Sequence, residues 1–270
     1  MRKRITITIR DDIISYVDKL VDGNNIRSRS HAIENLLNKI IFENNINNCL
    51  ILAGGIREEF TDKGNRCMFL LKGKPILEHV IKRLESFNIK NFIIYSDYRN
   101  EDIEQYFKNG YKFGVNIDYI FEEKPSGTIK PLLLVRKKIK DTFLMVYGDT
   151  ISSIDINDFY SFHKSSGKIA TMALTTVSNP KDYGVVEIKG NKITNFVEKP
   201  TQSLGSYLVS AGIFIFEPRI FNYISSRMQS VEKDLIPSLI KKDVINGYTF
   251  QGLWININSP KDLNRARLLV

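Results

Sequence analysis

The chain has 270 residues, 43% of them hydrophobic and 26% charged, and this balance excludes a disordered or fibrous protein. Its only cysteines, Cys49 and Cys67, form no CxxC pair, which excludes a disulfide framework and a cysteine-based zinc site. The net charge of +9 favours partners that carry phosphate groups. Because no apolar run reaches the roughly 18 residues of a membrane span, we expect a cytoplasmic protein without a membrane partner.

Residues 1–43 predict a small β-α-α module. Residues 4–10 alternate between polar side chains and isoleucine, the pattern of a half-buried strand. Asp11 or Asp12 is expected to cap a first helix, which ends before Gly23, and a second helix is expected to open at Ser28 or Ser30. Residues 44–48 are polar and aperiodic and predict a linker.

This module is too small to bury its own apolar face, so we expect it to associate with a second copy. Its pattern resembles the ribbon-helix-helix repressors of the Arc and MetJ type, which insert a two-stranded ribbon into the major groove of double-stranded DNA. The resemblance implies a homodimer, with a tetramer as a further option. It places Arg4, Thr6 and Thr8 on base edges, and Ser28 and Ser30 beside a phosphate. The alternative is a dimerisation arm that does not contact DNA.

Residues 49–270 predict one α/β domain. Strands are expected over residues 49–53, 92–96, 117–121 and 143–147, and helices over 77–87, 101–107 and 130–138. Strands that alternate with helices of this length predict a largely parallel sheet. Ligands of such sheets bind outside the carboxyl ends of the strands. Three segments follow predicted strands: 52–55, 122–128 and 148–149.

Seven short motifs follow one another in this domain: Leu-Ala-Gly-Gly at 52–55, Gly-Lys-Pro-Ile-Leu-Glu-His at 73–79, Pro-Ser-Gly-Thr at 125–128, Tyr-Gly-Asp at 147–149, Tyr-Gly-Val-Val-Glu at 183–187, Phe-Val-Glu-Lys-Pro at 196–200 and Ser-Ala-Gly-Ile at 210–213. In this order they resemble the sugar-1-phosphate nucleotidyltransferase family. The resemblance implies a Rossmann-like mixed sheet and the attack of a sugar phosphate on the α-phosphorus of a nucleoside triphosphate.

The resemblance also implies a role for individual residues. Asp149 would hold Mg²⁺ if the domain is active, and Arg57 and Arg66 would supply positive charge to the triphosphate. Arg57 reaches the family's arginine position only if the alignment has a gap, and an ungapped alignment places Glu59 there. The residues expected to line the nucleotide are Leu52, Ala53, Gly54, Gly55, Glu122, Gly127 and Thr128. Those expected to line the sugar phosphate are Gly184, Glu198, Lys199, Ser210 and Gly212.

The chain departs from the family pattern at three places. The family's first loop reads Gly-Gly-x-Gly-Thr-Arg, whereas residues 54–60 lack the third glycine and contain Glu58 and Glu59. Arg66 stands where the family has lysine, and Asn256 replaces a second metal-binding aspartate. A lost carboxylate weakens Mg²⁺ binding because hard cations prefer charged oxygen ligands.

From the N-terminal resemblance together with these departures we expect a DNA-binding regulator whose degenerate domain binds a nucleotide, sugar phosphate or nucleotide sugar. The alternative is an active Mg²⁺-dependent sugar-1-phosphate nucleotidyltransferase that its N-terminal module assembles or autoregulates, and a third is a structural DNA protein. His31, His79 and His163 lie apart and are expected to be solvated helix residues. Trp254 is expected to pack the C-terminal segment.

Overall fold

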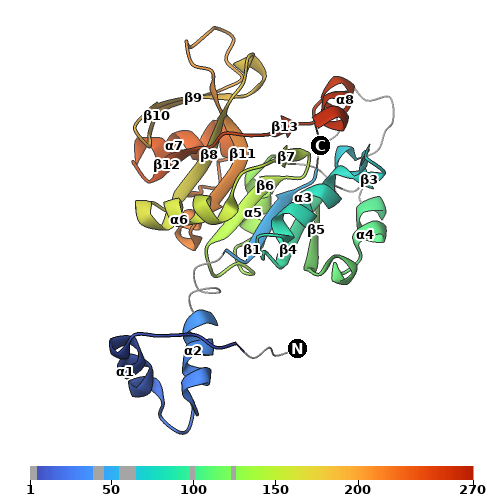
Figure 1. Cartoon of the computed structure of the whole chain (residues 1–270). Coiled ribbons are helices and arrows are strands. Elements are labelled where there is room, and N and C mark those ends of the chain that lie inside the picture. Colours follow the sequence, from blue (N-terminus) through green and yellow to red (C-terminus); the bar gives the residue numbers. More distant parts are fainter. Residues whose placement is uncertain (1–4, 39–45, 55–64, 98–100, 123–125, 270) are drawn as a thin grey trace. The chain divides into compact units, whose positions relative to one another are not determined.

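The computed structural model describes residues 5–38, 46–54, 65–97, 101–122 and 126–269 (Figure 1). They belong to two compact units, Met1–Asn45 and Ile46–Val270. In these ranges no helix is both long enough and apolar enough to cross a lipid bilayer.

The N-terminal unit contains two helices, α1 (Asp11–Leu20) and α2 (Arg29–Asn38). Arg29 donates two hydrogen bonds to the carboxylate of Asp18, at 2.5 and 2.7 Å, and so ties α2 to α1. Between the helices, the side chain of Asp22 accepts hydrogen bonds from three successive backbone amides, which fixes the turn. The prediction of two helices is confirmed, with Arg10 as the N-cap of α1 in place of an aspartate.

Residues 5–10 do not form the strand that their alternation predicts. Ile5 and Ile7 are 76% and 55% exposed. A strand needs a neighbour to pair its backbone N–H and C=O groups, and the described part of this unit offers none. The predicted ribbon is therefore not formed by one copy of the chain, and Arg4 lies outside the described residues.

The C-terminal unit is built on a mixed nine-stranded sheet with the order β5-β4-β1-β6-β11-β8-β12-β10-β9. The first four strands are parallel, and β11 runs antiparallel to β6 and to β8. The strands are β1 (Asn48–Leu52), β4 (Asn91–Asp97), β5 (Asn116–Glu122), β6 (Phe143–Tyr147), β8 (Ala170–Thr176), β9 (Gly184–Lys189), β10 (Lys192–Glu198), β11 (Leu208–Phe216) and β12 (Ile245–Thr249).

Helices cover both faces of this sheet, as expected for a parallel sheet buried on both sides (Figure 1). In β1, Cys49 and Ile51 belong to one core, whereas Leu50 and Leu52 belong to the other. The first core includes residues of α3 (Ile76–Glu85), α4 (Glu101–Phe107) and α6 (Ile156–Ser166). The second includes residues of α5 (Ile129–Val135) and α7 (Ile236–Lys241).

Two small sheets complete the unit. The hairpin of β2 (Leu70–Leu71) and β3 (Lys74–Pro75) precedes α3. The second sheet pairs β7 (Thr150–Ser152) with β13 (Trp254–Asn256), which α8 (Pro260–Leu269) follows. The α/β fold with a mixed sheet is thus confirmed.

The strand order positions the candidate site. From β1 the chain moves outward through β4 to β5, and it then returns to form β6 on the other side of β1. A crevice forms where the strand order reverses in this way, outside the carboxyl ends of the strands. The crevice expected for a ligand therefore lies beyond β1 and β6.

Candidate functional site

The carboxyl ends of β1 and β6 bring together residues that the sequence places far apart. The amide of Gly148 donates to the carbonyl of Leu52 at 2.9 Å, so the two strand ends are hydrogen-bonded beyond the sheet itself. Ala53 is buried and Gly54 half-buried directly after β1, and Asp149 is buried directly after β6. The predicted glycine loop and the predicted metal ligand therefore start from the same edge of the sheet.

A buried ion pair joins the predicted Arg66 to Asp149. The Nη2 atom of Arg66 lies 2.9 Å from Oδ2 of Asp149, and the two side chains are only 12% and 8% exposed. Arg66 Nη1 also donates to Oδ1 of Asn258 at 3.1 Å. The preceding residue, Asn65, is anchored to the end of β1 because its Nδ2 donates to the carbonyl of Ala53 at 2.6 Å. The tertiary structure thus pairs Arg66, which was predicted to bind the triphosphate, with Asp149, which was predicted to bind the metal ion.

The backbone around Asn256 runs alongside the segment that contains Asp149. Asn256 pairs with Thr150 between β13 and β7, and the next amide, that of Ile257, donates to the carbonyl of Asp149 at 2.9 Å. The Oδ1 atom of Asn256 is buried and has no hydrogen-bond partner among the described residues. A buried oxygen acceptor without a donor is suited to receive a cation or a ligand donor.

The described ranges hold no cluster of three or more His, Cys, Asp and Glu side chains that would bind a metal ion unaided. Mg²⁺ is usually held by one or two carboxylates, water and the phosphates of a substrate. The carboxylate of Asp149 and the amide oxygen of Asn256 are suitable as the few protein ligands that Mg²⁺ requires. These two residues would supply only part of a coordination sphere, and a phosphorylated substrate would have to supply the rest.

Glu122 is the centre of a second polar cluster, at the end of β5. Its buried carboxylate accepts hydrogen bonds from the hydroxyls of Tyr95 and of Ser126, the latter at 2.7 Å, and forms an ion pair with Lys130. Burial alone would raise the pKa of Glu122, but these donors outweigh it and lower the pKa to about 2. The carboxylate is therefore ionised at neutral pH.

The segment after Glu122 is held against a turn far along the chain. Gly127 has φ +95°, and a Cβ atom there would lie 2.2 Å from the carbonyl oxygen of Gln229. Thr128 Oγ1 donates to Glu232 at 3.1 Å, and the other carboxylate oxygen of Glu232 accepts from the hydroxyl of Tyr147. Glu232 thereby links two of the predicted motifs, Pro-Ser-Gly-Thr and Tyr-Gly-Asp.

The predicted sugar-phosphate residues of β9 and β10 lie together. A Cβ atom at Gly184 would lie 2.4 Å from the ring of Phe196 and 2.9 Å from Oε2 of Glu198, so only glycine allows this close approach. Lys199 is exposed and adopts a left-handed backbone, φ 47°, and its amide donates to the carbonyl of Tyr183 at 3.0 Å. Gly184, Glu198 and Lys199 therefore form one group.

Ser210 and Gly212 lie on β11, next to β6. Gly212 has φ +69°, and a Cβ atom there would lie 2.8 Å from the ring of Tyr147. This contact connects the Ser-Ala-Gly-Ile motif to the Tyr-Gly-Asp motif. Trp254 Nε1 donates to the carbonyl of Ala211 at 3.0 Å, which confirms that the tryptophan packs the C-terminal segment.

A cleft of about 730 Å³ opens beside these groups. Its lining includes Asn256 and Asn258, which belong to the Asp149 group, and Tyr183, which precedes Gly184. Pockets of roughly 300–1,000 Å³ are typical of small-molecule sites. The cleft is therefore large enough for part of a sugar phosphate or nucleotide.

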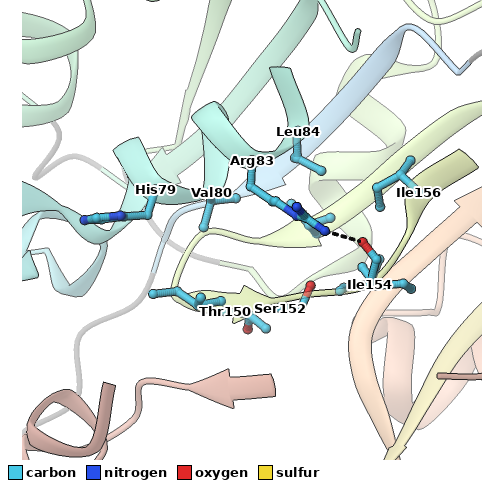
Figure 2. A pocket seen from close by; sticks show the side chains of 11 residues that line it. His79, Val80, Arg83, Leu84, Thr150, Ser152, Ile154 and Ile156 are labelled. Carbon is cyan, nitrogen blue, oxygen red and sulfur yellow. Dashed lines mark hydrogen bonds between the residues drawn. The ribbon is translucent and has the colours of Figure 1, made fainter. Parts of the chain in front are cut away.

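A second cavity, of about 30 Å³, lies between α3 and β7 and is shown in Figure 2. Most of its lining is aliphatic, and Arg83 at its side donates to the carbonyl of Ile154 at 3.3 Å. It has room for little more than one water molecule. We therefore assign it no substrate.

One histidine differs from its prediction. His163 is only 1% exposed, and its ring nitrogens contact the hydroxyl of Thr171 at 2.7 Å and the carboxylate of Glu217 at 3.3 Å. Burial lowers its pKa, although Glu217 opposes this effect. His163 is a hydrogen-bonded core residue, so its prediction as a solvated side chain is wrong.

The site thus combines predicted residues with others that the sequence does not reveal. Gly55 and Arg57 lie outside the described residues, so their predicted roles stay predictions. Lys130 lies inside a predicted helix, which gives no reason to select it, and Glu232 lies in a segment without any motif. The contributors that sequence reasoning missed are Tyr95, Lys130, Glu232 and Asn258, and Tyr147 was included only as part of the Tyr-Gly-Asp motif.

Comparison with known proteins identifies the large unit. Residues 48–269 match the family model described as Nucleotidyl transferase. A mannose-1-phosphate guanyltransferase of Neurospora crassa is 31% identical over 79% of this chain and 61% of its own length. The catalytic subunit beta of mannose-1-phosphate guanylyltransferase from Xenopus tropicalis is 33% identical over 70% of this chain and 54% of its own. The chain thus spans little more than half the length of these relatives.

Solved structures agree with the fold. A Bacillus anthracis protein described as a glucose-1-phosphate thymidylyltransferase has a TM-score of 0.75 at 24% identity, over 82% of this chain and 94% of its own. HddC from Yersinia pseudotuberculosis has a TM-score of 0.71 at 23% identity, over 83% of this chain and 99% of its own. At this identity the likeness establishes the fold.

These findings correct the prediction of a DNA-binding regulator. The relatives are named as guanyltransferases, and the structure lacks the strand that would carry Thr6 and Thr8 into a groove. Ser28 caps α2, because its hydroxyl accepts from the amide of His31 at 3.2 Å, and Ser30 is exposed. The comparisons therefore favour the alternative, an enzyme. From residue 48 to residue 269, this chain belongs to the nucleotidyl transferase family.

Proposed function

We propose that the chain transfers a nucleotidyl group from a nucleoside triphosphate to a sugar 1-phosphate. A phosphate oxygen of the sugar attacks the α-phosphorus, the bond from that phosphorus to the oxygen bridging it to the β-phosphate breaks, and pyrophosphate leaves. The observation that carries this proposal is the ion pair of Asp149 and Arg66 at the reversal of the strand order, with Asn256 paired to the residue after Asp149. Membership of the family and the names of the relatives support it.

Phosphoryl-type chemistry asks the protein mainly for positioning and positive charge. The Arg66 guanidinium is always charged and can bind two oxygens of a phosphate at once. Its guanidinium forms an ion pair with Asp149, so binding of a triphosphate would exchange a carboxylate partner for a phosphate partner. Glu198 and Lys199 would orient the sugar phosphate. The ammonium group of Lys199 would supply a second positive charge besides the guanidinium of Arg66.

Asp149 and Asn256 would hold Mg²⁺ together with the phosphates of the substrate. When bound, the metal ion neutralises negative charge on the triphosphate. Asparagine supplies an oxygen ligand without formal charge, so we expect weaker binding of the free ion than two carboxylates would give. The substitution that first suggested an inactive domain is thus compatible with a metal ion that arrives with its nucleotide.

The test is release of pyrophosphate by the purified full chain. Each of the four nucleoside triphosphates is supplied with Mg²⁺ and a panel of hexose 1-phosphates, and we expect release that depends on both substrates. The active pair would name the base and the sugar. Folded protein that releases no pyrophosphate with any pair would contradict the proposal.

We further propose that the N-terminal unit assembles copies of the chain. Ile5 and Ile7 expose large apolar side chains, and Ile13, Tyr16 and Leu37 of the same unit are also exposed. Apolar surface gathered in so small a unit favours association.

We expect sedimentation equilibrium to report a dimer for the full chain and a monomer for the double variant Ile5→Ser, Ile7→Ser. The control is Ile188→Ser, which removes an exposed isoleucine from the large unit. A wild-type chain that stays monomeric at the highest soluble concentration would refute the assembly role.

A further inference from the structure

Lys130 lies near the carboxyl end of β5, on the sheet edge where the nucleotide is expected. It is the second residue of α5, and its Nζ atom forms an ion pair with Glu122 at the end of β5. The side chain of Glu122 is 6% exposed, whereas that of Lys130 is 48% exposed. The pair therefore consists of a buried anchor and a half-exposed ammonium group.

The anchor is built from several elements. Tyr95, near the end of β4, and Ser126 both donate to the Glu122 carboxylate, which is thus fixed from two sides. The low pKa of Glu122 keeps this carboxylate ionised throughout the neutral range. Lys130 consequently has a permanent partner that restricts its otherwise flexible side chain.

This anchor lies on the edge of the sheet where the nucleotide is expected. In the sheet register Tyr95 is level with Leu52 of β1 and with Ile120 of β5, so the ends of β1, β4 and β5 reach one edge. Gly127 packs against the carbonyl of Gln229, the amide of Ile129 donates to that carbonyl, and the hydroxyl of Thr128 accepts from the amide of Val231. The start of α5, which carries Lys130, is therefore fixed by the turn at Gln229.

A lysine ammonium group has three N–H donors and no acceptor. The ion pair with Glu122 occupies one donor, and the exposure of the side chain leaves others available to a ligand. Guanine has a carbonyl oxygen, O6, that can accept such a hydrogen bond, and uracil and thymine have the carbonyl oxygen O4. Adenine and cytosine present an amino group, which is itself a donor.

We propose that Lys130 is a specificity-determining residue that donates a hydrogen bond to the base carbonyl of the nucleoside triphosphate. The residue selects keto bases, namely guanine and uracil or thymine, over the amino bases adenine and cytosine. With an amino base, the ammonium group of Lys130 would face the amino group of the base, and neither donor would have an acceptor. Leaving polar groups unpaired discriminates between ligands more strongly than a difference in apolar contact does. This inference rests on the proposed nucleotidyl transfer and names its substrate class.

The test is equilibrium binding, measured by titration calorimetry with Mg²⁺ and each of GTP, UTP, ATP and CTP, without sugar phosphate. We expect the keto nucleotides to bind about 10-fold more tightly or better than the amino nucleotides. The variant Lys130→Met should reduce this difference to about twofold or less, chiefly by weakening GTP and UTP, because methionine keeps the apolar stem and lacks the donor.

Two further variants separate the donor from general effects. Lys130→Arg retains positive charge and donors and should keep the preference for keto bases. Lys138→Met is the matched control, because Lys138 is also 48% exposed and also forms an ion pair, with Asp118 near the start of β5. It should leave all four affinities unchanged. Melting curves establish that each variant is folded.

The outcomes distinguish this inference from the proposed function. Wild-type chain that binds keto nucleotides selectively, with selectivity lost in Lys130→Met, supports it. Wild-type chain that binds all four nucleotides equally, or a Lys130→Met variant that keeps the preference, overturns it and leaves nucleotidyl transfer intact. Wild-type chain that binds no nucleotide overturns the proposed function and this inference together.

Discussion

Replacing Asp149 with asparagine is expected to lower the rate of pyrophosphate release by about 10²- to 10³-fold, the effect of removing one well-placed electrostatic group from an active site. The carboxylate would be lost both as an oxygen ligand for Mg²⁺ and as the partner that positions Arg66. Asparagine has nearly the same shape, so the loss reports charge rather than volume. The measurement is the steady-state rate with the substrate pair that the wild-type chain uses.

The same substitution also leaves Arg66 buried without its counter-ion. Breaking a buried pair in this way costs about 3–5 kcal/mol of stability. The rate must therefore be measured at a temperature where circular dichroism shows the variant to be folded. Asp118→Asn is the control, because it removes an exposed carboxylate paired with Lys138. A folded Asp149→Asn variant with wild-type activity would contradict the assignment of Asp149.

Gly127→Ala is expected to destabilise the chain by about 3 kcal/mol or more. At φ +95° any side chain is strained, and the added Cβ would lie 2.2 Å from the carbonyl oxygen of Gln229. The backbone at either Gly127 or Gln229 must shift, which would also disturb the hydrogen bonds of Thr128 to Glu232 and from Val231. Chemical denaturation followed by circular dichroism measures the loss.

Gly190→Ala is the matched control for the cost of placing alanine at a positive φ. Gly190 also has a positive φ, +60°, but nothing lies within 4 Å of the position its Cβ would occupy. We expect this control to cost only the left-handed strain, about 1 kcal/mol. Equal losses in the two variants would show that the contact with Gln229 does not constrain the loop.

Local patterns predicted the α/β domain well. The expected strand over residues 143–147 and helix over residues 101–107 match β6 and α4 residue for residue, and the other predicted strands agree within one residue at each end. These elements are buried on one or both faces, so their apolar periodicity directly reflects the packing. Residues 5–10 have an equally regular pattern but no partner strand, and periodicity alone does not supply one.

The prediction of function was less successful because it gave substitutions in single motifs more weight than the order of all seven. The replacement of an aspartate by Asn256 suggested a loss of catalysis. In the structure Asn256 pairs with Thr150, the residue after Asp149, and its buried Oδ1 has no partner among the described residues, so the position still offers a ligand atom. The relatives named as guanyltransferases then favour the enzyme over the regulator.

The sequence by itself determined the succession of strands and helices, the glycine-containing motifs and their order, because each depends on spacing along a short stretch of chain. Only the tertiary structure decided which side chains meet. Arg66 reaches Asp149 and Asn258, and Glu232 reaches Tyr147 and Thr128. These contacts arise because parallel strands, paired in an order different from their order in the chain, bring their carboxyl ends to one edge, and no local pattern encodes that pairing.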